Sequence, residues 1–124
     1  PHRLPRTAAL IDAFGPALAA ADHIVLTDIY AAGEEPIPGV SLDALAVAIR
    51  RGVHVPLDIA PTLDDVVNAI VRAARPGDVV LTLGAGSIGT VPDKLIDALR
   101  RPAGASASDV DRASPDDHST GNQE

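Results

Sequence analysis

Apolar residues recur at three- and four-residue spacing in four stretches of the chain, as expected for helices with one buried face. The first stretch covers residues 10–21, with Thr7 as its capping residue. Gly15-Pro16 lies inside it, and proline removes a helical hydrogen bond, so a kink or break is expected there. The other three helices are expected to start at a capping residue or an early proline: Ser41, Thr62 and Pro92.

Three short, nearly continuous apolar runs lie between these stretches, over residues 23–29, 53–57 and 78–83. Runs of this kind are typical of buried parallel strands. Pro56 has no N–H to donate to a neighbouring strand, so the second run is expected at or near an edge of the sheet. Alternating helices and strands predict an α/β, Rossmann-like domain with an open, mostly parallel sheet covered by helices on both faces. With three strands, the sheet is expected to lack a segment at its N-terminal side.

Residues 1–101 carry all of this patterning and are expected to form one partial domain. Residues 102–124 are rich in Ala, Ser, Asp, Gly and Pro and show no apolar periodicity. Such a segment buries too little surface to offset the entropy lost on ordering, which predicts a disordered acidic tail.

Composition narrows the classes of function. The 124-residue chain has no cysteine, which excludes a disulfide framework and a thiolate metal site. Its net charge of −7 argues against nucleic acid as a partner, and no apolar run approaches the roughly 20 residues that cross a bilayer. The four histidines are scattered, so no metal site is expected.

Two polar segments carry candidate binding chemistry. Arg3 and Arg6 are three residues apart at a helix start, a spacing that lets two guanidinium groups bind a carboxylate or phosphate from the same side. Asp28 and Glu34 lie in a loop after the first strand, where open α/β sheets bind ligands. Asp28 and Glu34 could accept hydrogen bonds from an ammonium group or orient nearby arginines. The alternative interpretation is that the two arginines and the acidic turn are simply solvated and bind no ligand.

Residues 84–89 match the pattern G-x-G-x-x-G of dinucleotide-binding turns. That fingerprint also needs a helix starting in the motif and an acidic residue about 20 positions later, and neither is predicted here. A tight structural turn is the alternative interpretation. No G-x-x-x-x-G-K-[ST] phosphate loop occurs, and Lys94 is the only lysine, so no ATP triphosphate site is expected in this sequence.

Three motifs in order resemble the C-terminal domain of the Mur ligase family, specifically of the members that add L-alanine. They are Pro-His-Arg-x-x-Arg-Thr at residues 1–7, Asp-Ile-Tyr-Ala-Ala-Gly-Glu-Glu-Pro-Ile-Pro-Gly at 28–39, and Gly-Asp-Val-Val-Leu-Thr-Leu-Gly-Ala-Gly-Ser-Ile at 77–88. The resemblance covers roughly residues 1–100. Leu4-Pro5 departs from the aromatic residue and Ser or Thr usual in the family.

The resemblance implies roles for particular residues. Arg3 and Arg6 would hold the carboxylate of the incoming alanine and stabilise charge on the reacting acyl group. The wall of the amino-acid pocket would comprise Tyr30, Ala32, Gly33 and Glu34. The supporting loops would supply His2, Asp28, Gly84 and Gly86.

The resemblance also implies a parent enzyme that joins L-alanine to UDP-N-acetylmuramate through an acyl phosphate, using ATP and Mg²⁺ bound mainly by upstream domains. Such an enzyme serves peptidoglycan synthesis in the bacterial cytoplasm. The chain alone is expected to be inactive. Two alternatives remain: a stand-alone Rossmann-like nucleotide-binding module that uses the turn at residues 84–89, and a non-catalytic remnant.

Overall fold

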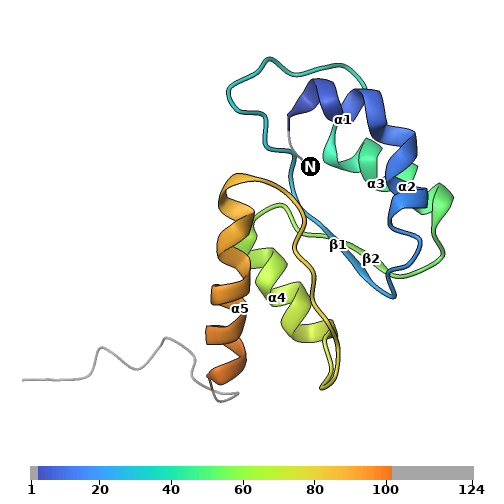
Figure 1. Cartoon of the computed structure of the whole chain (residues 1–124). Helices are drawn as coiled ribbons and strands as arrows, with labels where there is room; N and C mark the ends of the chain where they lie inside the picture. The colour runs from blue at the N-terminus through green and yellow to red at the C-terminus, as the bar shows by residue number, and fades with distance from the viewer. Residues whose placement is uncertain (1–2, 102–124) are drawn as a thin grey trace, which may run out of the picture.

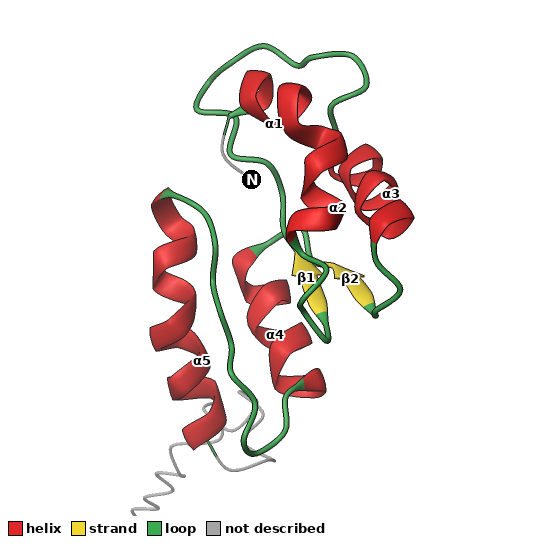
Figure 2. Ribbon diagram, turned by 45° about the vertical axis from the view of Figure 1, so that its right-hand side comes forward, coloured by secondary structure: helices red, strands yellow, loops and turns green. Residues whose placement is uncertain are grey.

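A small parallel sheet separates two groups of helices (Figure 1). The computed structural model of the chain describes residues 3–101. Helices α1, α2 and α3 lie on one side of the sheet, and α4 and α5 lie on the other (Figure 2). In chain order the elements are α1 Leu4–Leu10, the 3-10 turn η1 Ile11–Ala13, α2 Phe14–Ala17, β1 Ile24–Leu26, α3 Leu42–Gly52, β2 Leu57–Ile59, α4 Leu63–Ala73, the 3-10 turn η2 Gly86–Thr90, and α5 Val91–Arg100.

Strand β1 connects two hydrophobic cores because its side chains alternate between the faces of the sheet. Ile24 and Leu26 are buried against Leu45 and Ile49 of α3. Val25 packs with the core that α4 and α5 share. Strands β1 and β2 pair in parallel, with Ile24 opposite Leu57. The predicted α/β class, an open parallel sheet covered on both faces, is therefore confirmed.

Helices α3 and α4 form where their local signals predict them. The Ser41 Oγ accepts a hydrogen bond from the Ala44 N–H at 3.1 Å and caps α3. At the start of α4, Thr62 and Asp65 form a reciprocal capping box. The Thr62 Oγ1 accepts from the Asp65 N–H at 3.1 Å, and the Asp65 Oδ2 accepts from the Thr62 N–H at 3.2 Å. Backbone groups that would otherwise lack a partner are satisfied at both helix starts.

The first helical segment begins earlier than predicted. Helix α1 starts at Leu4, and Thr7 lies inside it with 1% of its surface exposed, so the prediction of Thr7 as a cap is wrong. Its hydroxyl instead donates to the Arg3 carbonyl at 3.0 Å. The predicted break is present as η1, which separates α1 from the short helix that contains Gly15-Pro16.

The strands differ from prediction in extent and in number. Strand β1 is shorter than the predicted 23–29, and β2 begins at Leu57, where pairing with β1 begins. Pro56, just before it, has no N–H and contributes only its carbonyl, which accepts the Ile24 N–H at 2.9 Å. The prediction of a strand at 78–83 is wrong. Within the described chain, no backbone hydrogen bond involves residues 79–83. An apolar run becomes a strand only beside a partner, and here it leaves exposed Val79, Leu81 and Leu83.

The longest helices of the described part have 11 residues, and none is long and apolar enough to cross a membrane. The predicted acidic tail, residues 102–124, lies outside the described residues.

Candidate functional site

A hollow of about 200 Å³ lies where β1 and the segment 78–83 end. Open α/β sheets bind ligands at this end of their strands, because helix starts and loops converge there. We call it the strand-end hollow. Its walls come from three segments: the loop after β1, the start of α4 and the glycine turn with η2. They are Thr27, Asp28, Ile29 and Tyr30; Pro61 and Leu63; and Leu83, Gly84, Ala85, Ser87 and Ile88.

Two polar contacts fix the floor of the strand-end hollow. The Thr27 hydroxyl donates to the Pro61 carbonyl at 3.4 Å and thereby links the loops after β1 and β2. Asp28 Oδ1 accepts the N–H of Ile29 at 2.8 Å. One carboxylate oxygen of Asp28 is therefore committed to the backbone, and the exposed remainder of the group faces solvent.

The glycine turn closes the third side of the hollow. Gly84 has φ of 152°, and a Cβ there would lie 3.0 Å from the Ile88 side chain, so this position requires glycine. Gly86 also has positive φ, at 72°, and begins η2. Because η2 runs from Gly86 to Thr90 and α5 starts only at Val91, the α-helix does not start within the motif as a dinucleotide-binding turn requires.

Arg3 is fixed through its backbone at the start of α1. Its N–H donates to the Tyr30 carbonyl at 2.9 Å, and its own carbonyl accepts both the N–H and the hydroxyl of Thr7, at 3.1 and 3.0 Å. Its φ of 61° is left-handed, an uncommon conformation for a residue other than glycine. Because Arg3 lies just before the first residue of α1, its backbone is not helical. This non-helical conformation sets the direction in which its side chain leaves the chain.

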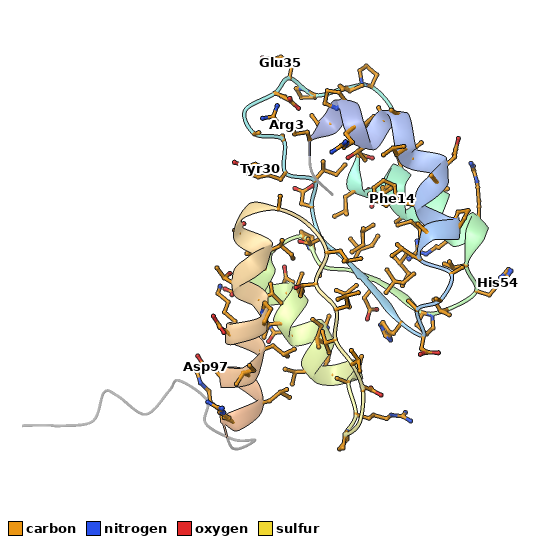
Figure 3. All side chains as sticks on the ribbon, viewed as in Figure 1. Arg3, Phe14, Tyr30, Glu35, His54 and Asp97 are labelled. Carbon is orange, nitrogen blue, oxygen red and sulfur yellow. The ribbon has the colours of Figure 1, made fainter. Side chains whose placement is uncertain are left out.

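A tight turn next to Tyr30 brings Glu34 to Arg3. Ala32 and Gly33 have φ of 53° and 78°, and the Glu34 N–H donates to the Ala31 carbonyl at 3.0 Å. Figure 3 shows Arg3 inside the curve of the loop that carries Tyr30 and Glu35. Arg3 Nη1 lies 3.6 Å from Glu34 Oε1, with side chains 59% and 30% exposed. Of the two acidic residues proposed to orient an arginine, Glu34 is the one in contact with Arg3.

The structure brings together some of the predicted site residues and separates others. Asp28, Tyr30 and Gly84 line the strand-end hollow. Arg3, Ala32, Gly33 and Glu34 adjoin it through Tyr30, whose carbonyl binds the Arg3 N–H. Arg6 is exposed in α1, and its side chain forms no hydrogen bond or ion pair within the described chain. Gly86 does not line the hollow, and His2 lies outside the described residues.

Sequence reasoning missed two features of this region. Thr7 supports Arg3 from inside α1, and the spacing Arg-x-x-x-Thr is the available signal, since a threonine hydroxyl readily bonds the carbonyl four residues earlier. Ser87, which lies within the predicted turn at residues 84–89, also lines the hollow. Its position just after an apolar run pointed to this end of the sheet.

A larger hollow, about 290 Å³, lies between α4 and α5, away from the strand ends. Among residues 3–101, one close ion pair lies at this hollow: it joins Lys94 Nζ to Asp64 Oδ1 at 3.0 Å, between two side chains that are 48% and 82% exposed. Solvent screens an ion pair this exposed, and the hollow lies away from the strand ends, so we take the strand-end hollow as the candidate site although it is smaller. Among residues 3–101 no three acidic or histidine side chains are grouped to hold a metal ion.

Comparison with known proteins gives a consistent family. The profile described as "Mur ligase, glutamate ligase domain" matches residues 2–86, a range that includes all of the predicted site residues. A Burkholderia cenocepacia protein named "UDP-N-acetylmuramate--L-alanine ligase" is 48% identical over 103 residues, 83% of this chain and 22% of the relative. Proteins of the same name from Solibacter usitatus and Burkholderia mallei are 46% and 48% identical, over 81% and 77% of this chain and 21% and 20% of theirs. The chain thus spans about a fifth of the length of these relatives.

Proposed function

The chain belongs to the Mur ligase family through the glutamate ligase domain, and on that basis we propose that it is the amino-acid-binding domain of a ligase that joins L-alanine to UDP-N-acetylmuramate. The observation that carries the proposal is the fixed position of Arg3 beside the strand-end hollow. Its backbone is held at both N–H and carbonyl, so its guanidinium is presented from a rigid support. An arginine whose backbone is already fixed has less conformational entropy to lose when its guanidinium binds a carboxylate.

In this proposal Arg3 and Arg6 bind the carboxylate of alanine and orient its amine toward the acyl group. ATP, with Mg²⁺, supplies the activation that turns the lactyl carboxylate of UDP-N-acetylmuramate into an acyl phosphate. The residues that bind ATP and Mg²⁺ are assigned to other domains of the ligase, because this sequence has no phosphate loop. When the amine attacks the acyl carbon, negative charge develops on the acyl oxygen, and a nearby guanidinium stabilises it. The tetrahedral intermediate then collapses to the amide as the C–O bond to phosphate breaks, the amine loses a proton and phosphate leaves.

The strand-end hollow fits a small substrate side chain. It combines the apolar surfaces of Ile29, Leu63 and Ile88 with the Asp28 carboxylate and the Ser87 hydroxyl. At about 200 Å³ it is smaller than typical pockets for drug-sized ligands, which begin at about 300 Å³. We assign the intact enzyme to the bacterial cytoplasm, where ATP is available.

The test is a chimaera in which this chain replaces the matching 103 residues of the Burkholderia cenocepacia ligase. Phosphate release that depends on both L-alanine and UDP-N-acetylmuramate is the readout. Arg3→Ala or Arg6→Ala is expected to raise the alanine KM or lower kcat at least tenfold, roughly the 1.4 kcal/mol of a charge-assisted hydrogen bond. The 124-residue chain by itself is expected to show no turnover.

The matched control is Arg51→Ala, which removes an exposed guanidinium from the end of α3. It is expected to leave the kinetics unchanged. A folded chimaera without activity, or an active one whose Arg3 and Arg6 variants behave like the Arg51 variant, would contradict the proposal.

A further inference from the structure

The two carboxylate oxygens of Glu34 have different surroundings. Oε1 faces Arg3 Nη1 at 3.6 Å, whereas Oε2 is shielded from solvent and has no hydrogen-bond partner among the described residues. A buried carboxylate oxygen without a hydrogen-bond donor destabilises the folded state, because it has lost its hydrogen bonds to water and formed none within the protein. The neighbouring Glu35 is exposed and forms no ion pair in the described chain.

The loop is bent so that Glu34 reaches Arg3. Ala32 adopts a left-handed backbone conformation that disfavours any side chain, and Gly33 continues it. Arg3 is itself left-handed. Strained backbone at Arg3 and in the turn just before Glu34 persists only where the surroundings determine both, and such strain is frequent in binding sites. The backbone conformations of Arg3 and of the turn before Glu34 therefore both contribute to this contact.

We infer that Glu34 is a positioning residue that directs the Arg3 guanidinium and does not itself contact the ligand. A solvent-shielded Oε2 is closed to a ligand, and Glu34 is not among the residues that line the strand-end hollow. The donor suited to Oε2 is a second N–H of the Arg3 fork, which would convert one long contact into a paired one. The remaining N–H groups of Arg3 then point to the carboxylate or phosphate ligand. The inference rests on the proposed function and goes beyond it by separating the role of Glu34 from that of Arg3.

The first measurement needs no ligand. In the 124-residue chain, the {¹H}–¹⁵N NOE of the Arg3 Nε–H reports how well the guanidinium is ordered. Glu34→Gln is expected to lower this NOE to the level of exposed arginines such as Arg51, because a neutral amide holds the guanidinium weakly. Glu34→Asp keeps the charge but shortens the side chain, and it is expected to lower the NOE as well. Glu35→Gln, which removes the same charge one residue away, is expected to leave it unchanged.

The second measurement uses inorganic phosphate as the probe. The direction in which the phosphate Kd changes distinguishes a positioning role of Glu34 from a simple effect of its charge. Removing a negative charge next to Arg3 would by Coulomb attraction alone strengthen phosphate binding. If Glu34 positions Arg3, Glu34→Gln instead raises the phosphate Kd at least threefold. Glu35→Gln, with the same change in charge, leaves the Kd equal or lower. Backbone amide spectra of each variant show that the changes stay within the loop.

The outcomes separate the inference from the proposed function. An ordered Arg3 Nε–H that Glu34→Gln releases, without any binding of phosphate, upholds the positioning role and counts against the ligand role of Arg3. Equal NOE values in the chain and its Glu34→Gln variant overturn the inference. Phosphate affinities that change alike in the two glutamine variants also overturn it, because the effect would then be one of charge alone.

Discussion

Replacing Gly52 by alanine tests the contact that holds α2 against α3. Gly15 and Gly52 face each other, and a Cβ on Gly52 would lie 3.0 Å from both the Cα and the carbonyl carbon of Gly15. It would also lie 3.2 Å from Cδ of Pro16. The nearest atoms belong to the backbone, so no side chain can rotate away and the two helices must move apart.

Two opposing effects set the expected magnitude. Alanine at the end of α3 gains up to about 1 kcal/mol of helix propensity over glycine. Forcing an extra methyl group into a closely packed contact costs about 1–3 kcal/mol. A net loss of about 1 kcal/mol follows, and for a domain of this size that lowers Tm by about 4–8 °C.

Thermal unfolding followed by far-UV circular dichroism measures this loss. The matched control is Gly89→Ala, because a Cβ at Gly89 would meet nothing within 4 Å. It is expected to melt at or slightly above the temperature of the unchanged chain. The reasoning is refuted if Gly52→Ala melts no lower than Gly89→Ala.

Two further changes test a helix cap and an exposed surface. Thr62→Ala removes the cap of α4 and is expected to cost about 1 kcal/mol in urea unfolding. Hydrogen bonds from the Thr62 hydroxyl and N–H lower the pKa of Asp65 from 3.8, so this carboxylate adds stability above pH 3.8 that is lost as pH falls through its folded value. In the same variant, the free energy of unfolding should therefore fall less steeply as the pH is lowered into the acid range. An unchanged pH dependence of the free energy of unfolding would contradict the role of the cap. Leu81→Lys changes a side chain that is 75% exposed, so it is expected to leave Tm unchanged and to reduce the binding of a hydrophobic dye; a fall of several degrees in Tm would show that Leu81 is packed.

The sequence predicts best the elements whose signals are local. A helix such as α3 or α4 carries its periodicity and its cap in one stretch, so Ser41 and Thr62 marked both starts correctly. A strand depends on its neighbour, and this is why residues 78–83, with strand-like composition, form no strand. The shift of β2 toward Leu57 has the same origin, since pairing with β1 decides where the ladder begins.

The sequence predicted where the candidate site lies better than it predicted the contacts within the site. The rule that ligands bind at the ends of parallel strands located Asp28, Tyr30 and Gly84 around one hollow. The contact between Arg3 and Glu34 depends on left-handed backbone at Arg3 and Ala32, two residue types for which sequence predicts ordinary φ values. Family motifs identified these residues as a group, and the comparisons confirm the family, while their separate roles remain predictions.

The hydrogen bond from the Arg3 N–H to the Tyr30 carbonyl makes the site a cooperative product of folding. Helices α1 and α2 and all of β1 lie between these two residues in the chain. The guanidinium therefore takes its position only after these helices have folded against the sheet, and it loses this position when they melt. A short peptide copied from either loop would carry the right side chains without their arrangement. Under the proposed role of Arg3, ligand affinity and the stability of this half of the molecule are accordingly linked.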